Sequence, residues 1–178
     1  HAVNSFHEDK LRRKEMMQHI VANRKWMDIG TGAGGIMDEL SPIASKVVAI
    51  EPQKTARESL KQIGYEVYPN IKEVQDSDFD IVTLFHVFEH FTDPLDELKS
   101  IHQKMVVGGK IIIEIPHAND LLLSFLEHES FKKFSFWSEH LILHTRVSLA
   151  RFLEEAGFKE IVISGCQRYP LANHLHWL

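Results

Sequence analysis

The sequence has one cysteine, only short hydrophobic runs and no excess of positive charge. The lone cysteine, Cys166, excludes an internal disulfide and a cysteine-based zinc site, and it favours a reducing, cytoplasmic setting. Apolar runs such as 111–113 and 121–123 are far shorter than the roughly 18 to 20 residues that cross a bilayer, so we expect no membrane span. The net charge is −5, whereas nucleic-acid-binding proteins normally present a basic field. We therefore expect no nucleic-acid partner.

The 178 residues have the composition of one soluble globular domain, with 44% hydrophobic and 25% charged side chains. The sequence shows no internal repeat and no linker rich in proline, glycine or serine, so we predict a single domain over 1–178. The chain opens at His1 without a methionine and ends on an aromatic, apolar segment at 166–178. We expect both ends to be cut from a longer natural protein.

Short apolar runs alternate with longer amphipathic stretches along most of the chain, which is typical of a parallel α/β sheet. The predicted fold is α/β, with a three-layer, doubly wound, Rossmann-like sheet that is mostly parallel. Glycines 108 and 109 are expected to turn the chain before a strand. The predicted strands are 26–29, 46–50, 66–68, 79–85, 110–115 and 158–164, and the predicted helices are 8–22, 34–40, 53–63, 94–105 and 147–156.

A glycine-rich loop follows the first predicted strand, in the pattern Asp28-x-Gly30-x-Gly32-x-Gly34. Glycines at alternate positions let the backbone turn sharply and let a ligand approach closely, at a helix N-terminus that offers unpaired N–H groups. The simplest alternative is a tight turn with no ligand. With Gly35, the loop also fits the G-x-G-x-x-G dinucleotide pattern, which is weak on its own.

Two carboxylates bear on which ligand the loop binds. Asp28 would repel a pyrophosphate but tolerate the ammonium and sulfonium groups of S-adenosylmethionine (SAM). Glu51 ends the second predicted strand, where a carboxylate accepts hydrogen bonds from ribose hydroxyls. Both NAD and SAM contain a ribose, so Glu51 supports either cofactor and Asp28 favours SAM.

Several ordered segments give the sequence its resemblance to a known family. They are DIGTGAG at 28–34, VAIEP at 48–52, FDIVTLFHVFEHFTDP at 79–94, GGKIIIEIP at 108–116, and His140, Ser148 and Gly157 with their neighbours. Over about residues 24–165 the chain resembles class I SAM-dependent methyltransferases of the ubiquinone-biosynthesis and sugar-modifying group. The Glu-His-x-x-Asp-Pro segment and the Gly-Gly-Lys strand start are more specific than the glycine loop.

The resemblance implies that SAM lies across the carboxyl ends of the strands. By position, the methionine part would meet the glycine loop and the end of the fourth strand, the ribose would meet Glu51, and the adenine would lie near the residues that follow. The implied cofactor-binding residues are Asp28, Gly30, Thr31, Gly32, Gly34, Glu51, Pro52, Gln53, Asn70, Ile71, Phe85, His86, Val87 and His90.

The sequence departs from the family pattern on its substrate side. The family sheet usually ends in two antiparallel strands, but only 158–164 is visible here, so we expect the final antiparallel strand to be missing. The segment after Pro116 also lacks the usual asparagine-rich loop. Both departures leave the cofactor side unchanged.

The string His86-x-x-Glu89-His90 matches an inverted zinc-protease motif. That chemistry needs both histidines one turn apart on a helix, with a third ligand elsewhere. Because the string leaves an apolar strand and Asp93-Pro94 soon starts a new helix, we expect no continuous helix there and no metal. The pair His140 and His144 has helical ligand spacing too, and its simpler interpretation is two polar residues in a loop.

A substrate-side insertion is predicted over 117–146, rich in aromatic and histidine side chains that would exclude water from an acceptor. Ordinary packing is the alternative for each of these residues. Lys132 and Lys133 are a weak indication of an acidic acceptor. The first residues, 1–23, are predicted to form a helix that covers SAM. The insertion's notable residues are Phe125, Phe131, Phe134, Phe136, Trp137, His117, His128, His140 and His144.

The function predicted is methyl transfer from SAM, by in-line displacement, to a small-molecule or sugar-like acceptor, leaving S-adenosylhomocysteine (SAH). An oxygen or carbon acceptor also needs a base, for which His140 and His117 are candidates because imidazole is neutral near pH 7. The alternatives are a domain that binds SAM or SAH without catalysis and, less favoured, an NAD-dependent oxidoreductase. The acceptor and the oligomeric state are not readable from the sequence.

Overall fold

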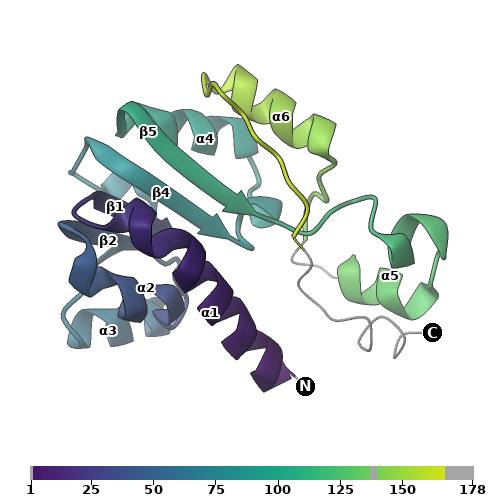
Figure 1. Cartoon of the computed structure of the whole chain (residues 1–178), viewed down its shortest axis with the longest axis horizontal. Helices are drawn as coiled ribbons and strands as arrows, with labels where there is room; N and C mark the ends of the chain where they lie inside the picture. The colour runs from purple at the N-terminus through teal and green to yellow at the C-terminus, as the bar shows by residue number, and fades with distance from the viewer. Residues whose placement is uncertain (1, 137–139, 167–178) are drawn as a thin grey trace. The chain divides into compact units, whose positions relative to one another are not determined.

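The computed structural model describes residues 2–136 and 140–166 (Figure 1). Within it the chain forms two compact units. The first unit comprises 1–85 and 99–114, and the second comprises 86–98 and the chain from 115 onward. None of the described helices combines the length and the apolar character needed to cross a bilayer.

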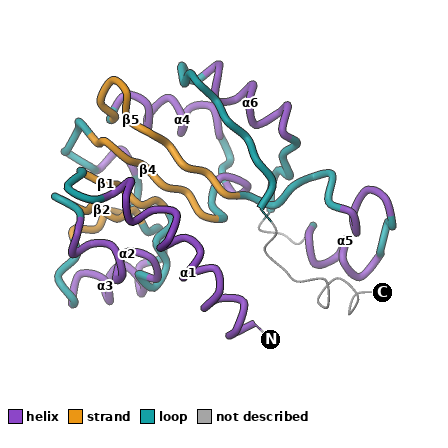
Figure 2. Tube along the Cα trace, viewed as in Figure 1, coloured by secondary structure: helices purple, strands orange, loops and turns teal. Residues whose placement is uncertain are grey.

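The first unit contains a five-stranded sheet in the order β3-β2-β1-β4-β5 (Figure 2). All four strand pairs are parallel, which confirms the predicted Rossmann-like α/β class. Pairing is regular at the centre, where Asp28 lies opposite Ala49 on one side and Thr83 on the other. The strands are β1 (Lys25–Ile29), β2 (Lys46–Ile50), β3 (Glu66–Tyr68), β4 (Phe79–Phe85) and β5 (Met105–Glu114).

Three helices and a set of large apolar side chains complete the first unit. They are α1 (Ala2–Val21), α2 (Gly35–Leu40) and α3 (Lys54–Gln62), and short 3-10 turns at Ser41–Ile43 and Ile71–Glu73 connect strands. A fold in which strands and helices alternate strictly would have a helix between β3 and β4. This chain has the short turn Ile71–Glu73 there instead. Met17 and Val21 on α1 are fully buried in one cluster with Trp26, Met37 and Leu60. The second half of α1 is therefore part of the core, beyond the covering role predicted for 1–23.

The β5 strand begins five residues earlier than predicted, and the expected turn at Gly108 and Gly109 lies inside it. Gly108 has a φ of +81°, and the register to β4 shifts between Phe79 and Ile81. An irregularity of this kind lets a strand continue past a glycine pair. The glycines therefore mark a bulge where sequence reasoning placed a turn.

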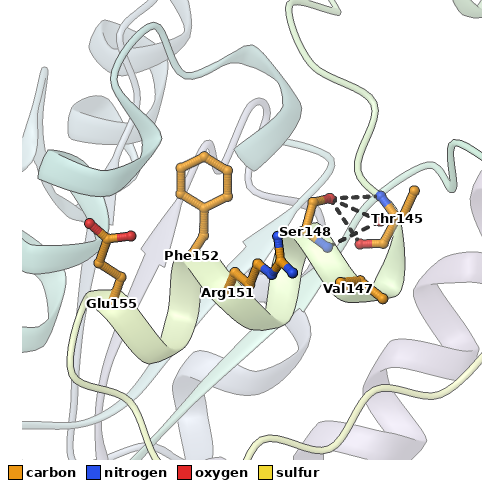
Figure 3. A pocket seen from close by; sticks show the side chains of 6 residues that line it. All are labelled: Thr145, Val147, Ser148, Arg151, Phe152 and Glu155. Carbon is orange, nitrogen blue, oxygen red and sulfur yellow. Dashed lines mark hydrogen bonds between the residues drawn. The ribbon is translucent and has the colours of Figure 1, made fainter.

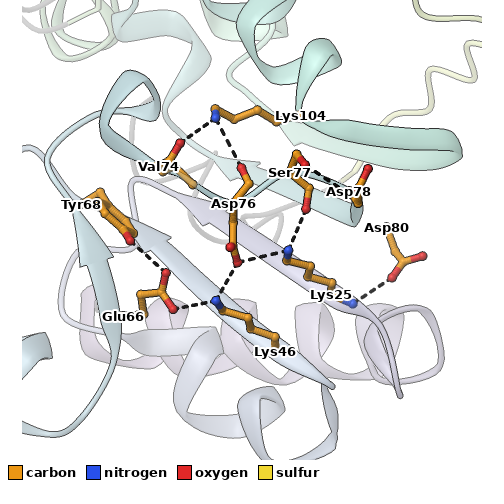
Figure 4. A network of polar contacts seen from close by, with 10 residues as sticks. All are labelled: Lys25, Lys46, Glu66, Tyr68, Val74, Asp76, Ser77, Asp78, Asp80 and Lys104. Atoms are coloured by element: carbon orange, nitrogen blue, oxygen red, sulfur yellow. Dashed lines mark hydrogen bonds and ion pairs between the residues drawn. The ribbon is translucent and has the colours of Figure 1, made fainter.

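A network of ion pairs joins the amino ends of the central strands (Figure 4). The Lys25 and Lys46 ammonium groups lie 3.1 and 2.6 Å from the same oxygen of Asp76, and Lys46 also pairs with Glu66. These hydrogen bonds raise the pKa of Lys46 and lower that of Asp76. Ligands of open α/β sheets bind at the opposite, carboxyl edge, so we interpret this network as structural.

The second unit contains short helices and loops. It includes the 3-10 turn η3 (Phe88–His90), the π-helix η4 (Leu121–Phe125), α5 (Glu129–Ser135) and α6 (Arg146–Glu155), and α4 (Pro94–Gln103) runs from it into the first unit. The absence of a continuous helix from His86 to His90 is confirmed.

The strand predicted at 158–164 is wrong: these residues form no strand. Its alternating apolar pattern suits a sheet edge, but a strand exists only through pairing, and the side chain of Val162 is 92% exposed. Trp137 and most of 166–178 lie outside the described residues.

The bulge in β5 predicts a strict need for glycine at 109. A Cβ atom there would lie 3.0 Å from the Val106 carbonyl oxygen and 3.1 Å from that of Asp80, and backbone atoms cannot move aside. We expect Gly109→Ala to lower the free energy of unfolding by about 1 to 3 kcal/mol in urea titrations. The control is Gly165→Ala, where the nearest atom is the flexible end of Arg146. Equal stability of the two variants would contradict the prediction.

Candidate cofactor site and histidine cluster

Parallel pairing brings the ends of β1, β2 and β4 to one edge of the sheet in the first unit. Gly30 follows β1, Glu51 follows β2, and Phe85 is the last residue of β4. The strand order reverses between β1 and β4, and the crevice at such a switch point is where open α/β sheets bind ligands. The predicted cofactor residues of the first unit therefore gather where a ligand is expected.

The loop after β1 needs its glycines for conformation and for space. Gly30, Gly32 and Gly34 all have positive φ, at 74°, 60° and 99°. A Cβ on Gly34 would lie 3.1 Å from a carboxylate oxygen of Asp38, whereas a Cβ on Gly32 would meet nothing within 4 Å. Gly34 is thus constrained by close packing, and the backbone at Gly32 faces open space that a ligand can enter.

Glu51 fastens this loop to the following one through its carboxylate. One oxygen accepts a hydrogen bond of 2.7 Å from the Gly32 N–H, and the other accepts one of 2.7 Å from the Gln53 N–H. The side chain is buried, with 6% exposed. Each carboxylate oxygen has a second lone pair, so this carboxylate can still accept hydrogen bonds from a bound diol. Arg57 supports the turn by donating to the carbonyl oxygens of Glu51 and Pro52.

Asp28 is buried in the centre of the sheet, with 3% of its surface exposed. Its carboxylate accepts a hydrogen bond from the Thr83 hydroxyl on β4, and that hydroxyl accepts one of 2.8 Å from the Trp26 indole. The Thr31 hydroxyl donates to the Asp28 carbonyl oxygen. Burial is the main cause that raises the pKa of Asp28 from 3.8 to about 6. The place of Asp28 among the cofactor-binding residues stays a prediction.

The two residues expected near adenine serve the turn after β3. The Asn70 side chain caps the 3-10 turn by accepting hydrogen bonds from the N–H groups of Lys72 and Glu73. Ile71 is buried, with 3% exposed. Both observations explain these residues structurally and leave an adenine contact untested.

Sequence reasoning missed a charged cluster that joins α1 to the end of β5. Arg12 and Arg13 donate to the Glu114 carboxylate at 2.9 and 2.6 Å. The Arg13 guanidinium also lies over the Phe85 ring, 4.4 Å from its centroid. Its positive charge partly opposes the rise in the pKa of Asp28 that burial causes. The sequence marks only Glu114, which is a lone charge within the apolar run 111–115, and no local pattern indicates that Arg12 and Arg13 are its partners.

In the second unit, His86 follows β4 directly and adopts a φ of +57°, which is rare for a residue with a side chain. Its Nδ1 lies 3.5 Å from the Glu89 carboxylate, and Nε2 of His90 lies 4.0 Å from the same oxygen. Non-glycine residues in this conformation cluster at functional sites, so the strain marks His86 for attention.

The two candidate bases differ in their surroundings. His140 lies with its ring centroid 5.1 Å from that of His90, and its Nδ1 is 2.8 Å from the Ser135 carbonyl oxygen. His117 is exposed and pairs through its backbone with His144. His144 is buried against Phe88, and burial lowers its pKa.

The predicted insertion presents several exposed apolar side chains, including Phe125 (78% exposed), Phe134 and Phe136. His128 instead caps α5 by accepting a hydrogen bond from the Phe131 N–H. A separate hollow of about 290 Å³ lies along α6 (Figure 3). Its hydroxyl groups belong to a capping box, so we assign it no ligand. The lining residues are Thr145, Val147, Ser148, Arg151, Phe152 and Glu155.

The raised pKa of Asp28 predicts a pH-dependent stability. The folded protein binds the proton more tightly than the unfolded chain, so this carboxyl stabilises the fold below about pH 4, and that contribution is lost as the pH rises through about 6. The total loss is about 3 kcal/mol. We expect Asp28→Asn to gain stability relative to the natural protein over this range in urea unfolding. A difference that stays constant with pH would contradict the assignment.

Comparison with known proteins identifies the family of the chain. A family model described as a methyltransferase domain matches residues 6–162. The ubiquinone biosynthesis O-methyltransferase of Acinetobacter baylyi is 25% identical over 174 residues, covering 89% of this chain and 72% of that protein. The corresponding protein of Idiomarina loihiensis is 26% identical, covering 83% and 67%.

Solved structures share the fold. A SAM-dependent methyltransferase from Archaeoglobus fulgidus aligns with a TM-score of 0.71 at 20% identity, over 87% of this chain and 70% of that one. A SAM-dependent methyltransferase from Thermotoga maritima aligns with a TM-score of 0.69 at 21% identity, over 88% and 73%. A plantazolicin methyltransferase solved in complex with SAH aligns with a TM-score of 0.59 at 18% identity, over 73% and 54%.

The family match covers most of the chain, and the parallel sheet, glycine loop and buried acid after β2 are arranged as the resemblance implied. The chain belongs to the class I SAM-dependent methyltransferases.

Proposed function

We propose that the first unit binds SAM along the carboxyl edge of its sheet and that the chain methylates a small-molecule or sugar-like acceptor. The observation that carries the proposal is the Glu51 carboxylate, which bridges the N–H groups of Gly32 and Gln53 beside the open space at Gly32. A carboxylate held in this way can accept from the two ribose hydroxyls. When bound, SAM supplies a methyl group on a sulfonium sulfur, which the acceptor takes by in-line displacement to leave SAH.

The chain's own residues contribute mainly by placement. Gly30, Thr31, Gly32 and Gly34 form a loop held to β2 by the hydrogen bond from the Gly30 N–H to the Ile50 carbonyl oxygen, at 2.7 Å. A loop held in this way fixes the orientation of its ligand relative to the acceptor. Good orientation of two reactants lowers the activation barrier by roughly 7 to 11 kcal/mol. We further propose that Phe85, His86, Val87 and His90 contribute to the methionine end, as the resemblance implies.

A hydroxyl acceptor needs a base, and we propose His117 or His140 for that role. A different structural observation supports each of these two histidines as the base. His117 is exposed and so can meet an acceptor in solution. His140 is held by the Ser135 carbonyl oxygen, which fixes its ring. The ubiquinone-biosynthesis relatives are O-methyltransferases by name, which supports an oxygen acceptor and leaves its identity to experiment.

Titration calorimetry with SAH tests the cofactor proposal. We expect the protein to bind SAH and not NAD. Glu51→Gln should weaken the affinity for SAH by about 10- to 100-fold, because one charge-assisted acceptor is lost. The control is Glu58→Gln on the exposed face of α3, which should leave SAH affinity unchanged. Binding of NAD without SAH would reject the proposal, and binding of SAH equally well to both variants would remove Glu51 from the site.

The base is tested by SAH formation with a panel of hydroxylated small molecules. We expect one of His117→Asn and His140→Asn to lose at least about 100-fold in turnover while SAH affinity is unchanged, since a positioned base contributes roughly 100- to 10,000-fold. Full turnover in both variants would exclude these bases. Binding of SAH with no turnover on any acceptor would favour the alternative of a binding domain without catalysis.

A further inference from the structure

We propose that Glu89, His90 and His140 form a binding site for one divalent transition-metal ion, and that Zn²⁺ is the ion best suited to it. All three residues belong to the second unit, and each offers one donor atom within 4.8 Å of the other two. The site is argued from its own donor atoms and not from the proposed function, and its test leaves His90 unchanged because that residue is also proposed for the methionine end of SAM.

The Glu89 side chain is the observation that points to a cation. It is fully buried, and neither of its carboxylate oxygens has a hydrogen-bond partner among the described residues. Buried carboxylates in proteins are normally paired with a charge or coordinate a metal, because desolvating an uncompensated charge is costly. Among the described residues, the imidazoles of His86 and His90 lie within 4.0 Å of a Glu89 oxygen, and they carry charge only when protonated.

The distances leave room for an ion. Nε2 of His90 lies 4.0 Å from a Glu89 oxygen, which is too long for a hydrogen bond. Ligands that bind Zn²⁺ at about 2.1 Å lie roughly 3.4 Å apart in a tetrahedral site. Small side-chain rotations would therefore bring the three donors onto one ion without moving the backbone.

His140 is held in the way that metal-ligating histidines usually are. Its Nδ1 lies 2.8 Å from the Ser135 carbonyl oxygen, so this nitrogen is the N–H donor and the unprotonated lone pair is on Nε2. A carbonyl partner of this kind orients the ring and raises the basicity of the ligating nitrogen.

The two segments that supply the ligands are fastened together by their backbones. The Glu89 carbonyl oxygen accepts hydrogen bonds from the N–H groups of Leu141, at 2.9 Å, and Ile142, at 3.2 Å. His140 is therefore held next to the 3-10 turn that carries Glu89 and His90. This arrangement is built into the fold of the second unit and does not require the ion.

The donor set decides which ion is expected. Two imidazoles and one carboxylate suit Zn²⁺, whereas Mg²⁺ and Ca²⁺ prefer oxygen ligands. Three protein ligands also leave one position open, as in zinc sites that bind water or substrate.

A metal was not expected from the sequence because the inverted motif needs one helix through His86 to His90, and the structure has no such helix. The third ligand comes instead from His140, fifty positions further along the chain. A His140 that ligates an ion is not free to act as a base, which leaves His117 as the base of the proposed reaction.

The test is calorimetric titration of Zn²⁺ into tag-free protein that has been stripped with a chelator, with the metal content then measured by elemental mass spectrometry. We expect one Zn²⁺ per chain, unaffected by excess Mg²⁺. Glu89→Gln and His140→Asn should each weaken the affinity for Zn²⁺ by at least about 100-fold. Loss of a residue that only hydrogen-bonds to a metal ligand typically costs about 10- to 100-fold. Bound Co²⁺ should give the visible absorption of a four-coordinate ion.

The matched control is His102→Asn, which removes an exposed histidine outside the cluster and should leave Zn²⁺ affinity unchanged. Circular dichroism establishes that each variant is folded, and His140→Asn serves where loss of the buried Glu89 charge prevents folding. Absence of stoichiometric Zn²⁺, or equal affinity in the control and the ligand variants, overturns the proposal. SAH binding, measured on the same samples, reports separately on the proposed function.

Discussion

The parallel pairing of β1 with β2 on one side and β4 on the other is the constraint on which the first unit depends. Because parallel strands all end at the same edge, residues distant in sequence meet there without any specific contact between them. Gly30 and Glu51 are brought within reach in this way, and the hydrogen bond from the Gly32 N–H to Glu51 then fixes one loop to the other. Strand register brings these positions together, and the glycines of the loop then give it the backbone conformation that the site needs.

The same pairing explains a buried acid in the middle of the sheet. Thr83 lies directly opposite Asp28, and its hydroxyl joins the Asp28 carboxylate to the Trp26 indole. The cost of burial appears as the raised pKa of Asp28, so the family's acidic residue before the glycine loop reduces stability at neutral pH.

The sheet and the glycine loop were predictable from sequence because both have local signatures. The runs at 46–50, 66–68 and 79–85 match the observed strands, since buried parallel strands are continuous apolar segments bounded by polar residues. The extent of β5 was not predictable, because a glycine pair has the same pattern in a turn and in a bulge. Glu114 contacts Arg13, and Glu89 lies near His140, although the members of each pair are more than fifty positions apart in the sequence. No local sequence pattern encodes such contacts.

The two buried glutamates differ in the groups that compensate the burial of their carboxylates. Glu51 and Glu89 are each almost inaccessible to solvent, at 6% and 0% exposed. The oxygens of Glu51 accept from two backbone N–H groups, which compensate part of the desolvation cost and hold the carboxylate in place. Glu89 has no such donors among the described residues and faces imidazole nitrogens instead. The proposed ion would compensate the burial of Glu89 as the two N–H groups compensate that of Glu51, so the neighbours of each carboxylate distinguish the ligands proposed for them.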